Sequence, residues 1–135
     1  LASLMISRMT VISPFKQLQL DTALVPVPLH KQRLSERGFN QSNELSTIIG
    51  SALSIPVCDI VERTKKTWTQ TKLPDELRRD NVKNAFTLKE GVGTVQPRLI
   101  VIDDVTTSGS TLDAVARPLW ANGAKEVWGL TVARG

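Results

Sequence analysis

The chain has 135 residues, of which 41% are hydrophobic, and carries a formal net charge of +4 with a pI of about 9.6. This length supports one domain with one core, and no apolar run reaches the roughly 20 residues of a membrane helix. The charge surplus suits an anionic ligand but is smaller than that of a typical nucleic-acid-binding domain.

The first elements predicted are a strand, a helix and a second strand. Residues 23–29, ALVPVPL, form an apolar run stopped by prolines, which predicts a buried strand leading into a rigid turn. From Phe39 onward apolar residues recur at helical spacing until Pro56. This stripe consists of Leu45, Ile48, Ile49, Ala52 and Leu53. Residues 57–61, VCDIV, predict the second strand, in which Cys58 is expected to be a small buried residue.

A long polar segment follows. Residues 62–72 predict a loop, and residues 73–82 predict a short helix. Between Arg63 and Lys83 lie seven Lys or Arg residues against three acidic ones, and such a run is either a solvated face or part of an anion site. Residues 84–88 predict a third strand and residues 90–97 a turn.

The last elements are a strand, a helix and a strand. The unbroken apolar run in residues 98–103, RLIVID, is typical of a parallel strand covered on both faces. The next helix has an apolar stripe of Leu112, Val115, Ala116 and Leu119. Pro118 is expected to kink its last turn, Asn122 and Gly123 to end it, and residues 126–133 to form the final strand. Alternating strands and helices predict an α/β domain over residues 1–135 with an open, mostly parallel twisted sheet flanked by helices.

Ligands of such sheets bind in the loops beyond the carboxyl ends of the strands. Two predicted loops lie in that position, residues 26–39 and residues 103–111. The second is rich in small hydroxylated residues from Thr106 to Thr111. Its amides, Gly109 and the start of a helix at about Ser110 or Thr111 predict a phosphate site. The alternative is that Ser110 or Thr111 only caps the helix, which is worth about 1 kcal/mol.

Asp103 and Asp104 directly follow the predicted strand and would repel an anion in this loop. Sugar hydroxyls or Mg²⁺ would offset this repulsion, because carboxylates accept hydrogen bonds from vicinal diols and bind hard cations. The alternative is a solvated acidic turn. Other phosphate motifs do not fit, since the chain has no G-x-x-x-x-G-K-[ST] sequence and its GVGTVQ sequence precedes a strand.

The apolar run, the acidic pair and the following VTTSGST resemble the phosphoribosyl-pyrophosphate (PRPP) signature of type I phosphoribosyltransferases. Residues 25–42, VPVPLHKQRLSERGFNQS, and the final VARG resemble the ComF/GntX competence-type branch of that family. Further matches are Arg63, Thr67, Gln70, Arg78, Asn81, Ala85 and Phe86. The resemblance implies a type I phosphoribosyltransferase-like fold, here expected to lack a carboxyl-terminal hood and to be truncated at its amino terminus.

The resemblance also implies roles for individual residues. The 5′-phosphate cradle would be Thr107, Ser108, Gly109, Ser110 and Thr111. Asp103 and Asp104 would be the catalytic pair that contacts the ribose hydroxyls. The pyrophosphate loop would be Val27, Pro28 and Leu29, with Arg33 and Arg37 either facing the pyrophosphate or bracing the next helix. A mobile loop would contain Arg63, Lys65, Lys66, Thr67 and Gln70, with Trp68 covering the site or packing against the domain.

Two functions are consistent with this resemblance. The first is a cytoplasmic phosphoribosyltransferase, a pentosyl glycosyltransferase of nucleotide metabolism that uses PRPP with Mg²⁺, the metal being bound through PRPP and not by direct protein ligands. Its acceptor is unidentified, and His30 is a weak candidate for a general base. The second is a non-catalytic PRPP-sensing or nucleic-acid-handling module linked to competence and DNA uptake. In that case Lys65, Lys66 and Lys72 would contact single-stranded nucleic acid. A purely structural protein is a third alternative.

Overall fold

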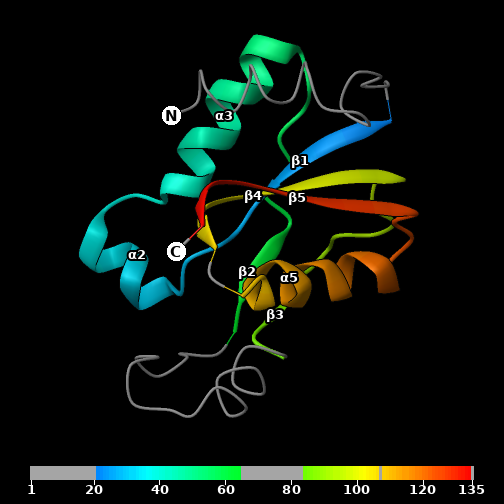
Figure 1. The fold of residues 1–135 in the computed structure, drawn as a ribbon. Coiled ribbons are helices and arrows are strands. Elements are labelled where there is room, and N and C mark those ends of the chain that lie inside the picture. The colour runs from blue at the N-terminus through cyan, green and yellow to red at the C-terminus, as the bar shows by residue number, and fades with distance from the viewer. Residues whose placement is uncertain (1–20, 65–83, 107, 135) are drawn as a thin grey trace.

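The computed structural model describes residues 21–64, 84–106 and 108–134. Its central sheet has three parallel strands in the order β1-β4-β5, namely β1 (Thr22–Pro26), β4 (Arg98–Thr106) and β5 (Glu126–Arg134). Helix α3 (Gln41–Leu53) covers one face and helix α5 (Ser110–Ala121) covers the other (Figure 1). The predicted α/β architecture with a parallel sheet is confirmed.

The core has two layers because successive side chains of a strand point to opposite faces of the sheet. The layer under α3 consists of Leu24, Leu45, Ile49, Ile55, Ile100 and Ile102. The layer under α5 includes Ala23, Val25, Leu99, Val101, Ala114, Val115 and Leu119. Both faces of β1 and β4 are therefore covered, which explains why their sequences are apolar without alternation.

The second predicted strand forms later in the chain than expected. Val57 makes one isolated parallel bridge to Leu24, whose amide donates to the Pro56 carbonyl (2.9 Å). The chain then leaves the sheet, and β2 (Val61–Arg63) pairs antiparallel with β3 (Phe86–Leu88). The prediction of a strand over residues 57–61 was wrong in its bounds, because residues from Ile60 onward pair with the β3 segment and not with β1.

Helix α2 (Lys31–Arg37) was missed, since residues 26–39 were expected to form a loop. None of its residues is buried, so it has no apolar stripe that a sequence could reveal. Instead its ends are closed locally. The Nδ1 atom of His30 accepts from the amide of Gln32 (3.3 Å), and Gly38, with φ of 77°, donates to the Leu34 carbonyl (2.8 Å). His30 therefore has a structural role as the N-cap.

Other boundaries also differ from the predictions. Strand β4 continues to Thr106, so Asp103 and Asp104 lie inside a strand that pairs with β5, and not beyond its end. Helix α5 continues through Pro118 to Ala121, with the Asn122 side chain donating to the Pro118 carbonyl (2.7 Å). In α3, Ile48 is 53% exposed although it belongs to the predicted stripe. The predicted helix over residues 73–82 lies outside the described residues.

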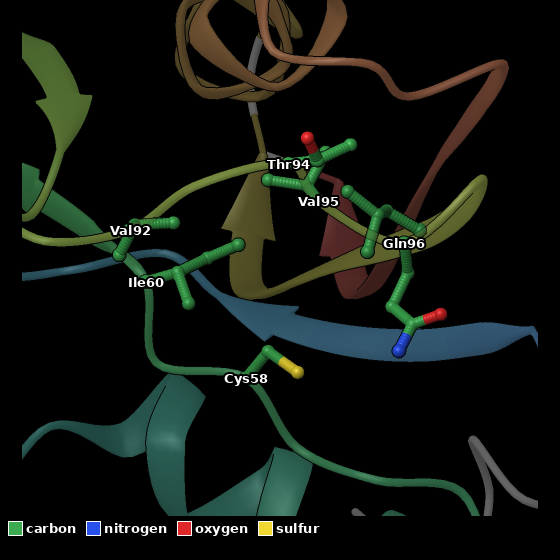
Figure 2. A pocket seen from close by; sticks show the side chains of 7 residues that line it. Cys58, Ile60, Val92, Thr94, Val95 and Gln96 are labelled. Carbon is green, nitrogen blue, oxygen red and sulfur yellow. The ribbon is translucent and has the colours of Figure 1, made fainter.

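Cys58 is half-buried and not fully buried as expected, because it borders a cavity of about 260 Å³. Ile60, Val92 and Val95 line the same cavity (Figure 2). Burial raises the pKa of the Cys58 thiol. Leu99, near the start of β4, also borders this cavity, which therefore lies toward the end of the strand opposite to Asp103.

Candidate functional site

At the carboxyl ends of β1 and β4 the chain leaves the sheet in opposite directions. From β1 the chain passes through α3 to Val57, which lies on the edge of β1 away from β4. From β4 it passes through α5, on the other face, to β5 on the opposite side. Such a switch point leaves a crevice beyond the strand ends, where α/β proteins bind ligands. The two loops predicted to carry the site both border this crevice.

Asp103 is the acidic group at the centre of the site. It is 8% exposed, and its Oδ1 atom accepts hydrogen bonds from the Ser42 hydroxyl (3.2 Å) and the Asp104 amide (2.9 Å). Burial, and next the neighbouring Asp104 carboxyl, raise the pKa of Asp103 to about 6. Donors from a ligand would stabilise the charged form of such a poorly hydrated carboxylate. The alternative of a solvated acidic turn is wrong for Asp103, because this residue is buried within a strand.

Asp104 is half-buried beside it. One of its carboxylate oxygens accepts a hydrogen bond from the Val105 amide (2.9 Å). Each carboxylate of the pair therefore accepts from the amide of the next residue, and this arrangement fixes the orientation of both groups relative to the strand. The carboxyl group of Asp104 also interacts electrostatically with that of Asp103.

The hydroxylated loop leads from β4 into α5. The helix begins at Ser110 as predicted, and its N-cap is Gly109, with φ of 80° and no side-chain capping bond. The Gly109 amide donates to Thr106 Oγ1 (3.2 Å), and the hydroxyls of Ser108 and Ser110 are hydrogen-bonded to each other. The alternative that Ser110 or Thr111 is the helix cap is therefore wrong. These hydroxyls and the positive end of the helix form a suitable environment for a phosphate.

The members of the predicted 5′-phosphate cradle differ in their exposure to solvent. Ser108 is exposed, and Gly109, Ser110 and Thr111 are half-buried. Thr107 lies outside the described residues. The described members are contiguous along the loop and the first turn of α5, only a few residues after Asp103 and Asp104. An acidic pair and a hydroxyl-rich loop therefore share one end of β4.

The predicted pyrophosphate turn is held by the start of α3. Val27 and Pro28 are buried, and the Val27 amide donates to the Ile102 carbonyl (2.9 Å). The Asn40 side chain donates to the Val27 carbonyl (3.0 Å) and accepts from the amide of Ser42 (3.0 Å) as the N-cap of α3. Neither Asn40 nor Ser42 was predicted to belong to the site. An asparagine before an apolar helical stripe is a known N-cap signal and could have revealed the first of them.

One of the predicted cationic residues, Arg63, is an electrostatic neighbour of Asp103. Arg63 is half-buried at the end of β2, with its guanidinium 5.4 Å from the centre of the Phe86 ring. Burial and the charge of Arg33 lower the pKa of Arg63, whereas Asp103 raises it. Arg63 of β2 therefore lies within electrostatic range of both Arg33 of α2 and Asp103 of β4. Arg37 is exposed in the last turn of α2.

The remaining predicted residues of the mobile loop follow Arg63 along the chain. Lys65, Lys66, Thr67 and Gln70 lie outside the described residues, as do Trp68 and Lys72. Within the described part of the chain, no group of three or more His, Cys, Asp or Glu residues could hold a metal ion. Nor does that part contain a helix long and apolar enough to cross a membrane.

The sequence has relatives among characterised proteins. The chain is 42% identical over 121 residues to competence protein F of Haemophilus influenzae, an alignment that covers 87% of this chain and 53% of that protein. It is 42% identical over 115 residues to the DNA utilization protein YhgH of Escherichia coli, with coverage of 82% and 49%. The chain therefore spans about half the length of the curated relatives it matches. No protein-family model matches the chain.

The fold is similar to that of adenine phosphoribosyltransferase from Leishmania tarentolae, with a TM-score of 0.55 at 17% identity. The matched region covers 98% of this chain and 55% of that enzyme. At this level of identity the likeness concerns the fold alone. Similarity in sequence and likeness in fold agree with the predicted resemblance to the ComF branch, and the predicted type I phosphoribosyltransferase-like fold is confirmed.

Proposed function

We propose that this protein binds PRPP together with Mg²⁺ in the crevice beyond β1 and β4 and transfers the phosphoribosyl group to an acceptor. The observation that carries the proposal is the buried Asp103 beside the hydroxyl-rich loop of α5. A carboxylate next to an anion site is unfavourable unless the ligand carries hydrogen-bond donors as well as an anion. A phosphorylated sugar carries both groups.

Each part of PRPP has matching residues in this proposal. Ser108, Gly109, Ser110 and Thr111, with Thr107, would bind the 5′-phosphate. Asp103 and Asp104 would accept hydrogen bonds from the ribose hydroxyls. The turn of Val27, Pro28 and Leu29 would bind the pyrophosphate, whose charge Arg33 and Arg63 would attract from α2 and β2.

The same residues favour displacement at the anomeric carbon. As the bond from this carbon to the pyrophosphate oxygen breaks, the leaving group takes the bonding electrons and positive charge develops on the sugar ring. The carboxylates of Asp103 and Asp104 stabilise that charge. Mg²⁺ bound to the ligand would neutralise charge on the pyrophosphate. The adjacent carboxylates fit such an ion, since it prefers one or two carboxylates together with phosphate oxygens over an all-protein site.

The transfer reaction can be tested by pyrophosphate release. The protein is incubated with PRPP, Mg²⁺ and a panel of nucleobases, and pyrophosphate is measured over time. We expect release with at least one acceptor, loss of release in Asp103→Asn, and unchanged release in the control Glu90→Gln, which alters an exposed residue that is not part of the proposed site. Absence of release with every acceptor, while PRPP still binds, would contradict the transfer reaction.

A second candidate is a non-catalytic PRPP-sensing or nucleic-acid-handling module linked to competence. It is favoured by the names of the relatives, a competence protein and a DNA utilization protein. If Lys65, Lys66 and Lys72 bind single-stranded DNA, replacing all three with alanine should reduce affinity and flatten its salt dependence, by about 0.7 in the log–log slope for each lysine–phosphate interaction removed. An unchanged slope in this variant, measured by fluorescence anisotropy, would contradict this candidate.

A further inference from the structure

The start of α3 is hydrogen-bonded to both the pyrophosphate turn and the acidic pair. We propose that Asn40 and Ser42 are positioning residues, which hold these two parts of the site at the separation that one PRPP molecule requires. This inference rests on the proposed binding of PRPP. It assigns the selectivity of the site for PRPP, over ribose 5-phosphate or pyrophosphate alone, to two side chains of one helix start.

Asn40 orients the peptide group at which the chain leaves β1. Its side-chain amide donates to the Val27 carbonyl (3.0 Å). The next residue, Pro28, has no amide hydrogen, so this peptide group offers only its carbonyl for hydrogen bonding. The Val27 amide is held one peptide group earlier, by the Ile102 carbonyl (2.9 Å). Asn40 therefore holds the peptide group that opens the pyrophosphate turn.

The same side chain also caps α3. Asn40 Oδ1 accepts from the Ser42 amide (3.0 Å), while Nδ2 donates to the Val27 carbonyl. The two atoms belong to one planar amide group, so a rotation of this group changes both hydrogen bonds together. The pyrophosphate turn and the first turn of α3 are therefore joined through a single rigid side-chain group.

Ser42 continues this connection to the acidic pair. It is 4% exposed, and its hydroxyl donates to Asp103 Oδ1 (3.2 Å). The Asp104 amide donates to the same oxygen (2.9 Å). Both bonds use Oδ1, so they hold the carboxylate without engaging Oδ2. The Ser42 carbonyl accepts from the Ser46 hydroxyl (2.8 Å), which ties Ser42 to the next turn of the helix.

These contacts form a continuous path of hydrogen bonds from Val27 through Asn40 and Ser42 to Asp103. Members of such a buried network stabilise one another, because a shift of one group weakens the bonds of the next. A ligand that joins two binding groups gains affinity from the second group only where the two parts of the site match its length. A fixed separation therefore favours PRPP over its fragments.

The experiment measures binding of PRPP, ribose 5-phosphate and pyrophosphate to the full chain by calorimetry, each with Mg²⁺. Ser42→Ala removes the hydroxyl that holds Asp103. We expect it to weaken PRPP and ribose 5-phosphate about tenfold and to leave pyrophosphate affinity unchanged. Asn40→Ser keeps an oxygen that can cap α3 but removes the amide group that holds Val27. We expect it to weaken PRPP and pyrophosphate about tenfold and to leave ribose 5-phosphate affinity unchanged.

A control and a double variant complete the experiment. Thr47→Ala removes an exposed hydroxyl of the same helix, which donates to the Asn43 carbonyl (2.9 Å), and should leave all three affinities unchanged. The double variant of Asn40→Ser with Ser42→Ala tests whether the two residues act as one unit. Its loss of PRPP affinity should be smaller than the product of the two single losses by about threefold or more. Thermal unfolding checks that every variant is folded at the temperature of the titrations.

The outcomes separate this inference from the proposed function. If PRPP binds but the variants weaken all three ligands equally, or none of them, the positioning roles are overturned and the proposed binding stands. Strictly additive losses in the double variant would also overturn them. If the selective losses are found while no acceptor gives pyrophosphate release, the transfer reaction fails and the positioning roles stand. If the parent protein binds none of the three ligands, both proposals fail.

Discussion

Asp103 is a buried carboxylate that costs the free protein stability. Its pKa is about 6 in the folded protein against an ordinary value of 3.8, mainly because of burial. Between these two values the folded protein binds more protons than the unfolded chain, so the free energy of unfolding falls as pH rises from about 4 to about 6. Above about pH 6 Asp103 is ionised, and the full free-energy cost of burying its charge is present. Such a cost is expected for a residue that is retained for ligand binding and not for stability.

Replacing Asp103 with asparagine should stabilise the free protein. The asparagine keeps an acceptor for the Ser42 hydroxyl but removes the buried charge. We expect the free energy of unfolding to rise by about 1–3 kcal/mol near neutral pH and to vary less with pH between about 4 and 6. Urea unfolding at several pH values measures both effects. A variant that is less stable than the parent near neutral pH would contradict the assigned cost of burial.

Gly109 has φ of 80° at the start of α5, a conformation that is strained for residues with a Cβ atom. A Cβ atom added there meets no atom within 4 Å, so only backbone strain would oppose Gly109→Ala. We predict a loss of about 1–2 kcal/mol in stability. Gly93 is the matched control, because it is equally open but its φ is not positive, and Gly93→Ala should be neutral or stabilising. Equal effects of the two substitutions in thermal unfolding would show that strain at Gly109 is not the cause.

Helix α3 approaches its neighbours closely at Gly50. A Cβ atom added there would lie 2.6 Å from the Ile55 carbonyl oxygen and 2.8 Å from Val57 Cγ2. We predict that Gly50→Ala lowers stability by about 1–3 kcal/mol, in spite of the better helix propensity of alanine. Ser51→Ala, at an exposed position of the same helix, should be neutral or slightly stabilising. Denaturant unfolding measures the free energy of unfolding of both variants. A Gly50→Ala variant as stable as the parent protein would contradict this close approach.

Elements with strong apolar patterns could be predicted from the sequence, and elements held by local polar contacts could not. The apolar runs of β1 and β4 and the stripe of α5 are direct consequences of burial, and each was found. Helix α2 buries no residue, so its caps at His30 and Gly38 were the only signals. Strand β4 extends three residues beyond the predicted end at Asp103 because pairing with β5 continues to Thr106, and such pairing is not visible in composition.

The candidate site shows the same limit. The acidic pair and the hydroxylated loop are contiguous in sequence, so their proximity was predictable. The hydrogen bond from Ser42 to Asp103 joins residues 61 positions apart and depends on where α3 begins over the sheet. Likewise, the proximity of Arg63 to Asp103 arises from the pairing of β2 with β3, and the sequence pattern placed β2 too early. Contacts of this kind require the three-dimensional fold.

At the scale of the whole molecule, the sheet places two kinds of charge around one crevice. The acidic pair belongs to β4, whereas the cationic residues Arg33 and Arg63 come from α2 and β2. The hydroxyl-rich loop follows the acidic pair in the sequence and leads into α5. In the proposed function the loop would bind the 5′-phosphate of PRPP, the acidic pair its ribose hydroxyls, and the two arginines would attract its pyrophosphate.

Magnesium-dependent binding of PRPP, measured by calorimetry, tests this arrangement most directly. The parent protein should bind PRPP more tightly with Mg²⁺ than without it. Asp103→Asn combined with Asp104→Asn should weaken binding at least about tenfold, because hydrogen bonds to charged groups contribute about 1.5–3 kcal/mol each. Glu90→Gln serves as the control. Since Asp103→Asn is expected to stabilise the fold, unfolding would not explain such a loss, and unchanged PRPP affinity in the double variant would contradict the ribose assignment.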